Sequence, residues 1–199
     1  MIWFINGKIG FGSPPAGRIF WGRDDEFVQG AAKFFDDPQM KFPPLDFKFL
    51  STCRARYALG YEFGREKLLE ISTTEGPHHL VGFSMGCAFA EGMAEAFGEE
   101  GVLGKTVHIN AFQAAHLEVK DRTRFVVEYQ LEDDPVINNK LLSLLGIARP
   151  GKIQGTTMSF TEKSGFLVTL IVHRSPIWHQ KGRFWENLSQ LVREQINAV

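Results

Sequence analysis

A serine between two glycines is the most specific chemical feature of the chain. Residues 82–86 read Gly-Phe-Ser-Met-Gly, at the end of the apolar run His79–Phe83 and just before a helix-like stretch with aromatic and Met side chains four residues apart. In a strand–turn–helix of this kind the serine occupies a tight turn that lifts its hydroxyl clear of the sheet, and the glycines allow strand and helix to approach closely. Ser84 is therefore a candidate nucleophile; the alternative is a glycine-bounded turn with an incidental serine.

A serine hydroxyl becomes a good nucleophile when an imidazole takes its proton and a carboxylate orients that imidazole. In a nucleophile turn of this type the partners follow in the order serine, acid, histidine. The acidic run 132–134 comes directly after the strand-like run Arg124–Gln130. Because functional groups collect at the carboxyl ends of parallel strands, Asp134 and Asp133 are candidates for the acid. The alternative is a pair of aspartates that caps a turn.

Two of the six histidines follow this acidic run. His173 comes just after a strand-like run, and His179 lies a few residues before the last helical stretch. The base is expected on the loop between the last strand and the last helix, which favours His179 and leaves His173 as the alternate.

Two backbone N–H groups are candidates for stabilising an oxyanion. One belongs to Met85, the residue after the serine, and the other to Gly7 or Lys8, after the first strand. Each such donor stabilises a transition state by about 3–4 kcal/mol. For Gly7 the alternative is a simple turn out of a strand.

The elements that must position these residues alternate along the chain. Helical patterns are expected after Asp24 or Asp25, after Ser51 or Thr52, after Ser84 and from about Gly182. In the third of these, the spacing predicts that Glu91 and Glu95 face away from the core. The strand-like runs are Ile2–Asn6, Phe47–Ser51, His79–Phe83, Thr106–Asn110 and Arg124–Gln130.

This alternation predicts right-handed crossovers around a mainly parallel sheet. After residue 150 the pattern changes. The runs Lys152–Phe160 and Gly165–Val172 flank a polar turn at residues 161–164, which predicts an antiparallel hairpin added to the sheet. The expected fold is an α/β three-layer sandwich, with a mainly parallel sheet and a C-terminal antiparallel hairpin.

Composition limits the classes of function. The 199 residues suit one domain, 1–199, and Lys plus Arg (22) nearly balance Asp plus Glu (23), so nucleic-acid binding is not expected. The two cysteines, Cys53 and Cys87, form no C-x-x-C motif and no disulfide framework, and no metal site is expected. The apolar start of about five residues is too short for a secretion signal or a membrane span, which makes the cytoplasm the default location. Opening directly on a strand also suits a domain cut from a longer chain. The sequence makes no prediction of oligomeric state.

Taken together, Asn6-Gly7, the 82–86 motif and Asp134-Pro135-Val136 resemble the α/β-hydrolase fold, specifically its small lipase-like serine hydrolases related to the class 3 lipases. The resemblance implies cleavage of a small-molecule or lipid carboxylic ester through an acyl-serine, without a cofactor. It also selects Asp134, since Asp-Pro-Val is the usual form of the family's acid loop. The chain departs from the family at Phe83, where His or Tyr is common. It also lacks an insertion large enough for a lid, which favours a short or water-soluble ester.

Two other functions are compatible with the same residues. One is cleavage or transfer of a thioester-linked acyl group by the same serine. The other is a binding module that keeps the fold without the catalytic residues.

Overall fold

The computed structural model of the chain describes residues 1–7, 17–21, 26–45, 51–71, 76–138, 140–144, 150–163, 173 and 176–198. Within these ranges six strands form one sheet in the order β2-β1-β3-β4-β5-β6, and every neighbouring pair is parallel. The strands are β1 (Ile2–Ile5), β2 (Met40–Lys41), β3 (His78–Phe83), β4 (Leu103–Ile109), β5 (Val126–Leu131) and β6 (Met158–Glu162).

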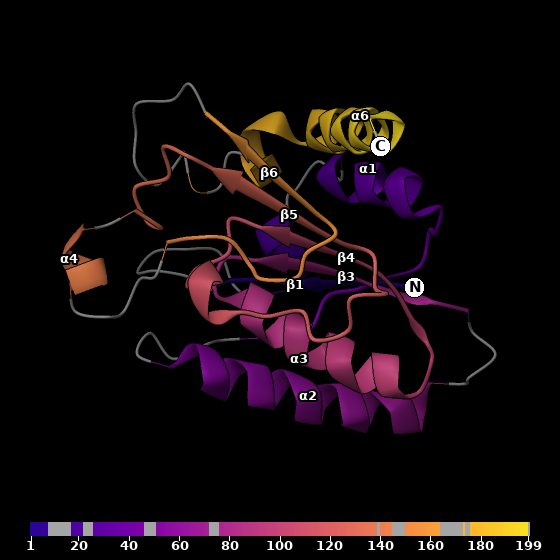
Figure 1. The fold of residues 1–199 in the computed structure, drawn as a ribbon. Coiled ribbons are helices and arrows are strands. Elements are labelled where there is room, and N and C mark those ends of the chain that lie inside the picture. Colours follow the sequence, from indigo (N-terminus) through magenta and orange to yellow (C-terminus); the bar gives the residue numbers. More distant parts are fainter. Residues whose placement is uncertain are drawn as a thin grey trace.

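Helices cover both faces of this sheet, so the molecule has three layers (Figure 1). On one face lie α1 (Glu26–Phe35) and α6 (Gly182–Asn197); on the other lie α2 (Cys53–Glu70) and α3 (Gly86–Glu99). The shorter helical segments are η1 (Arg18–Trp21), η2 (Ala114–His116), α4 (Lys140–Leu144) and the π-helical η3 (Pro176–Gln180). This is the three-layer α/β arrangement around a parallel sheet that the sequence predicts.

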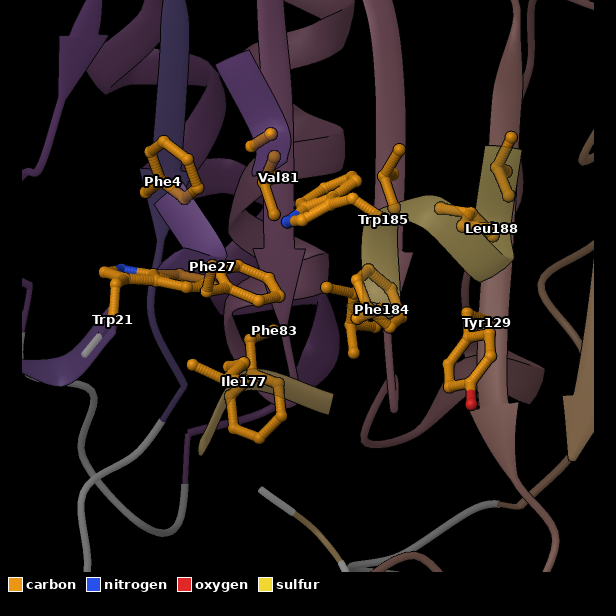
Figure 2. Packing of buried hydrophobic residues seen from close by; sticks show 14 of the residues in the cluster. Phe4, Trp21, Phe27, Val81, Phe83, Tyr129, Ile177, Phe184, Trp185 and Leu188 are labelled. Carbon is orange, nitrogen blue, oxygen red and sulfur yellow. The ribbon is translucent and has the colours of Figure 1, made fainter. Parts of the chain in front are cut away.

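Burial on both faces explains why the strands read as continuous apolar runs. In β1, Ile2 and Phe4 point into the core beneath α1 and α6, whereas Trp3 and Ile5 point into the core beneath α3. The first of these cores is rich in aromatic rings. Figure 2 shows part of it, including Trp21, Phe27, Phe83, Tyr129, Phe184 and Trp185.

The predicted antiparallel hairpin is not found among the described residues. Residues 158–160 of its first arm belong to the strand β6, which continues into the predicted turn as far as Glu162 and pairs with β5 in parallel. Thr161 and Glu162 have the polar composition of a turn because β6 is the last strand of the described sheet, and its end is partly exposed. The phenol of Tyr129 donates to the Glu162 carboxylate at 2.6 Å, which gives one of these polar residues a partner on the neighbouring strand. The second arm, Gly165–Val172, lies outside the described residues.

The other predicted helices and strands occur in the predicted order, apart from one predicted strand that is not tested and one observed strand that was not predicted. Thr52 caps α2, since its hydroxyl accepts the N–H of Ala55 at 3.1 Å. The strand expected at Phe47–Ser51 falls almost entirely outside the described residues. The short strand β2 occurs earlier, at Met40–Lys41, where no strand was predicted.

Glu91 does not face solvent, and that prediction is wrong. Its carboxylate is buried between α3 and the sheet, 2.6 Å from the Arg124 guanidinium and 3.1 Å from His108 Nε2. Burial alone would raise the pKa of Glu91, but the hydrogen bond with His108 and the charge of Arg124 hold that pKa below its ordinary value. Helical spacing could not reveal this, because both partners come from later in the chain.

No helix within the described ranges combines the length and the apolar character that crossing a membrane requires.

Candidate active site

Ser84 lies at the turn between β3 and α3, at the carboxyl edge of the sheet. Its φ is 53°, in the left-handed region that residues other than glycine rarely adopt. Backbone hydrogen bonds hold it there: its N–H donates to the Ile109 carbonyl at 3.0 Å, and its carbonyl accepts from Cys87 and Phe112, both at 3.2 Å. Because backbone strain of this kind persists only where the surroundings impose it, the turn is a candidate functional feature.

Glycines bring the end of β1 against this turn. A Cβ on Gly86 would lie 2.5 Å from the Ile5 carbonyl oxygen, so only glycine lets α3 begin so close to β1. A Cβ on Gly7 would lie 2.7 Å from the Ser84 Cβ. The backbone after β1 is thus packed directly against the serine.

The two residues predicted to supply oxyanion donors both lie next to Ser84, Met85 in sequence and Gly7 in space. Met85 follows the serine, precedes the first residue of α3 and is buried. Gly7 is also buried and touches the serine as just described. Lys8, the alternative to Gly7, lies outside the described residues.

An aspartate and a histidine meet at this edge of the sheet. The Asp134 carboxylate is fully buried, and its Oδ2 lies 2.5 Å from His173 Nδ1. Its other oxygen, Oδ1, accepts the N–H groups of Val136 at 2.9 Å and Ile137 at 3.3 Å. The Asp-Pro-Val turn thus fixes one carboxylate oxygen by backbone donors and leaves the other for the imidazole.

This contact orients His173. A carboxylate only accepts hydrogen bonds, so Nδ1 carries a proton toward Asp134, and in the neutral ring Nε2 is the acceptor. The His173 ring packs on the ring of Phe83, the residue before the serine, with centroids 4.9 Å apart. A serine, an imidazole and a carboxylate from three distant parts of the sequence are thereby gathered at one edge of the sheet.

The remaining predicted residues are placed as follows. The backbone of His179 lies in η3, and its side chain is outside the described part of the structure. Asp133 is exposed, one residue before the buried Asp134. The imidazole that contacts the aspartate is thus that of His173, the alternate in the sequence analysis.

Sequence reasoning missed Asn110, which is fully buried and whose side-chain amide donates to the His173 carbonyl oxygen at 2.8 Å. Its one sequence signal is that it is a polar residue at the carboxyl end of the strand-like run Thr106–Asn110. Among the described residues, no cluster of three or more His, Cys, Asp or Glu side chains could hold a metal ion.

No protein-family model matches the sequence, and no curated protein matches it. Solved structures to which the chain is similar include an esterase from Pyrobaculum calidifontis in a monoclinic crystal form. The two share 13% sequence identity with a TM-score of 0.49, over 96% of this chain and 73% of that one.

Proposed function

We propose that the protein is a serine hydrolase that cleaves carboxylic esters through an acyl-serine intermediate. The contact between Asp134 and His173 at 2.5 Å, beside the strained turn of Ser84, is the observation that carries the proposal. A histidine held by a buried carboxylate next to a serine is the arrangement that turns a hydroxyl into a nucleophile.

In the proposed reaction, the Ser84 hydroxyl attacks the ester carbonyl while His173 Nε2 takes its proton. Asp134 keeps the imidazole in the required tautomer and stabilises the imidazolium that forms. The N–H groups of Met85 and Gly7 stabilise the oxyanion of the tetrahedral intermediate. His173 then protonates the departing alcohol, and a water molecule activated by the same imidazole releases the acid from the serine.

The test is hydrolysis of a p-nitrophenyl ester series by the wild type and by Ser84→Ala. We expect kcat to fall by about 10³–10⁶-fold in the variant, since removing the nucleophile leaves only the remaining stabilisation. Ser189→Ala removes a hydroxyl that donates to the Trp185 carbonyl within α6, and it should retain wild-type activity. Full ester hydrolysis by Ser84→Ala would reject the proposal, and a preference for thioesters assayed in parallel would move the substrate to that class.

The identity of the base is tested separately. Because His173 contacts Asp134, His173→Gln should lower kcat by about 10²–10⁴-fold, the usual contribution of general acid–base catalysis. His179→Gln should leave kcat within a few-fold of the wild type. The opposite result would assign the base to His179.

A further inference from the structure

Asn110 is the first residue after β4, at the same edge of the sheet as Ser84. It is fully buried, and its φ of 47° lies in the left-handed region. Asparagine is one of the few residues that adopt this conformation readily. The Asn110 N–H donates to the Tyr129 carbonyl at 2.8 Å, so the backbone here is tied to β5.

Both ends of the Asn110 amide are used. Its Nδ2 donates to the His173 carbonyl oxygen at 2.8 Å, and its Oδ1 accepts the N–H of Leu131 at 2.9 Å. Leu131 ends β5 and in turn accepts the N–H of Asp134 on its carbonyl at 3.2 Å. One side chain thus connects the backbone of the proposed base with the strand that leads to the proposed acid.

The residues around Asn110 also hold the serine. The Ile109 carbonyl accepts the N–H of Ser84 at 3.0 Å, and the Phe112 N–H donates to the Ser84 carbonyl at 3.2 Å. The segment 109–112 therefore contacts the nucleophile through its backbone, and through the Asn110 amide it contacts the backbone of His173 and of Leu131, whose carbonyl accepts the N–H of Asp134. Few other side chains could replace that amide, since aspartate has no donor and glycine has neither group.

We propose that Asn110 is a positioning residue, which fixes the His173 backbone so that the imidazole meets Asp134 on one side and Ser84 on the other. This inference rests on the proposed function. Misplacing a catalytic group by about 1 Å lowers a rate by about 10²-fold, so loss of one buried hydrogen bond to the His173 backbone should reduce turnover without removing any reacting group.

Two substitutions distinguish the hydrogen bond of Asn110 to the His173 carbonyl from its hydrogen bond to the Leu131 N–H. Asn110→Asp keeps an acceptor for the Leu131 N–H but places a carboxylate oxygen against the His173 carbonyl. Asn110→Gly permits the left-handed backbone and removes both bonds. The matched control is Asp36→Gly, which makes the same kind of change at an exposed left-handed residue, with φ 57°, at the end of α1.

The experiment measures kcat and KM of the full chain with a p-nitrophenyl ester, beside the melting temperature of each variant. We expect kcat to fall by about 10–100-fold in both Asn110 variants with KM within about threefold, and no change in Asp36→Gly. A residue with only a structural role would lower the melting temperature and leave kcat of the folded protein unchanged. An unchanged kcat in either folded variant would overturn the inference. If Asn110→Gly does not fold, the kcat of Asn110→Asp decides, because this variant retains the hydrogen bond to β5.

A spectroscopic signature separates failure of this inference from failure of the proposed function. The proton between His173 Nδ1 and Asp134 should give a low-field proton resonance, assigned by its absence in His173→Gln. Loss or broadening of this resonance in Asn110→Gly supports the positioning role, and an unchanged resonance contradicts it. This readout needs no activity, so it holds even if the wild type hydrolyses no ester, a result that would reject the proposed function alone.

Discussion

Ser84 is held in a left-handed backbone conformation, in which its Cβ is crowded by the neighbouring backbone. The strain therefore depends on the presence of a Cβ and not on the hydroxyl. Removing the hydroxyl with Ser84→Ala leaves the strain in place, whereas Ser84→Gly removes both. We therefore expect Ser84→Gly to be more stable than Ser84→Ala by about 1 kcal/mol, measured by urea unfolding. Equal stability of the two variants would mean that the turn carries no strain.

The residues around Ser84 differ in how far the sequence could reveal them. Ser84 belongs to the short motif Gly-x-Ser-x-Gly, in which local geometry dictates the residue types, whereas the family resemblance of Asp-Pro-Val selected Asp134 over Asp133. The expectation that the base lies on the loop between the last strand and the last helix placed His179 ahead of His173. The contact of His173 with Asp134 joins residues 39 positions apart, and such a long-range contact could not be inferred from that expectation. Asn110 was missed because the sequence placed it at the end of the strand-like run Thr106–Asn110, and its partners His173 and Leu131 come from later in the chain.

At the scale of elements, the packing of α2 on α3 positions the helix that begins at the serine. Glycines make this contact close: a Cβ on Gly60 would overlap the Phe89 carbonyl, and a Cβ on Gly92 would overlap the Tyr57 carbonyl. The two helix backbones therefore touch along part of their length. Pairs of phenol and carboxylate side chains extend the contact, among them Tyr61 and Glu99 at 2.8 Å.

This close approach predicts opposite effects of alanine at two glycines. Gly60→Ala should destabilise the protein by about 1–3 kcal/mol, since the helices must separate to accept a methyl group. Gly98→Ala, near the exposed end of α3, meets nothing closer than 3.9 Å and should stabilise by about 0.5–1 kcal/mol. Thermal or urea unfolding measures both, and a neutral Gly60→Ala would contradict the packing described.

Elements were predicted well where one physical pattern governs them. Strands buried on both faces gave continuous apolar runs, and α1 and α6 have clear apolar faces that pack on the aromatic core. The prediction failed at β6, where partly exposed polar residues of a strand have the composition of a turn. It failed also at Glu91, whose partners Arg124 and His108 could not be inferred from helical spacing.

At the scale of the whole molecule, the edge of the sheet opposite the serine carries a histidine that responds to pH. Burial, together with the charge of the N-terminal ammonium, lowers the pKa of His79 to about 4. The Lys105 N–H donates to His79 Nδ1 at 2.9 Å, a bond that requires an unprotonated nitrogen. The folded protein thus holds this ring neutral.

Stability should therefore fall in mild acid. The pKa of His79 is about 6.5 in the unfolded chain and about 4 in the folded chain. Between these pH values His79 is protonated in the unfolded chain and neutral in the folded chain, so the free energy of unfolding drops as pH falls. The loss approaches about 3 kcal/mol at the lower limit. Urea unfolding at a series of pH values from 7 to 4 gives the free energy of unfolding as a function of pH. This free energy should fall less steeply with falling pH in His79→Gln than in the wild type, whereas substitution of an exposed histidine, His116→Gln, should leave the pH dependence unchanged. The same pH dependence of the free energy of unfolding in His79→Gln as in the wild type would contradict this account.

The most direct measurement of the proposed chemistry is labelling by a fluorophosphonate, which reacts only with an activated serine hydroxyl. Mass spectrometry of the labelled wild type should locate the probe on Ser84, because His173 and Asp134 activate that hydroxyl in the proposed mechanism. His173→Gln and Asp134→Asn should slow the labelling by about 100-fold or more while the proteins remain folded. Wild-type protein unlabelled at Ser84, or labelled equally fast in His173→Gln, would contradict the central claim.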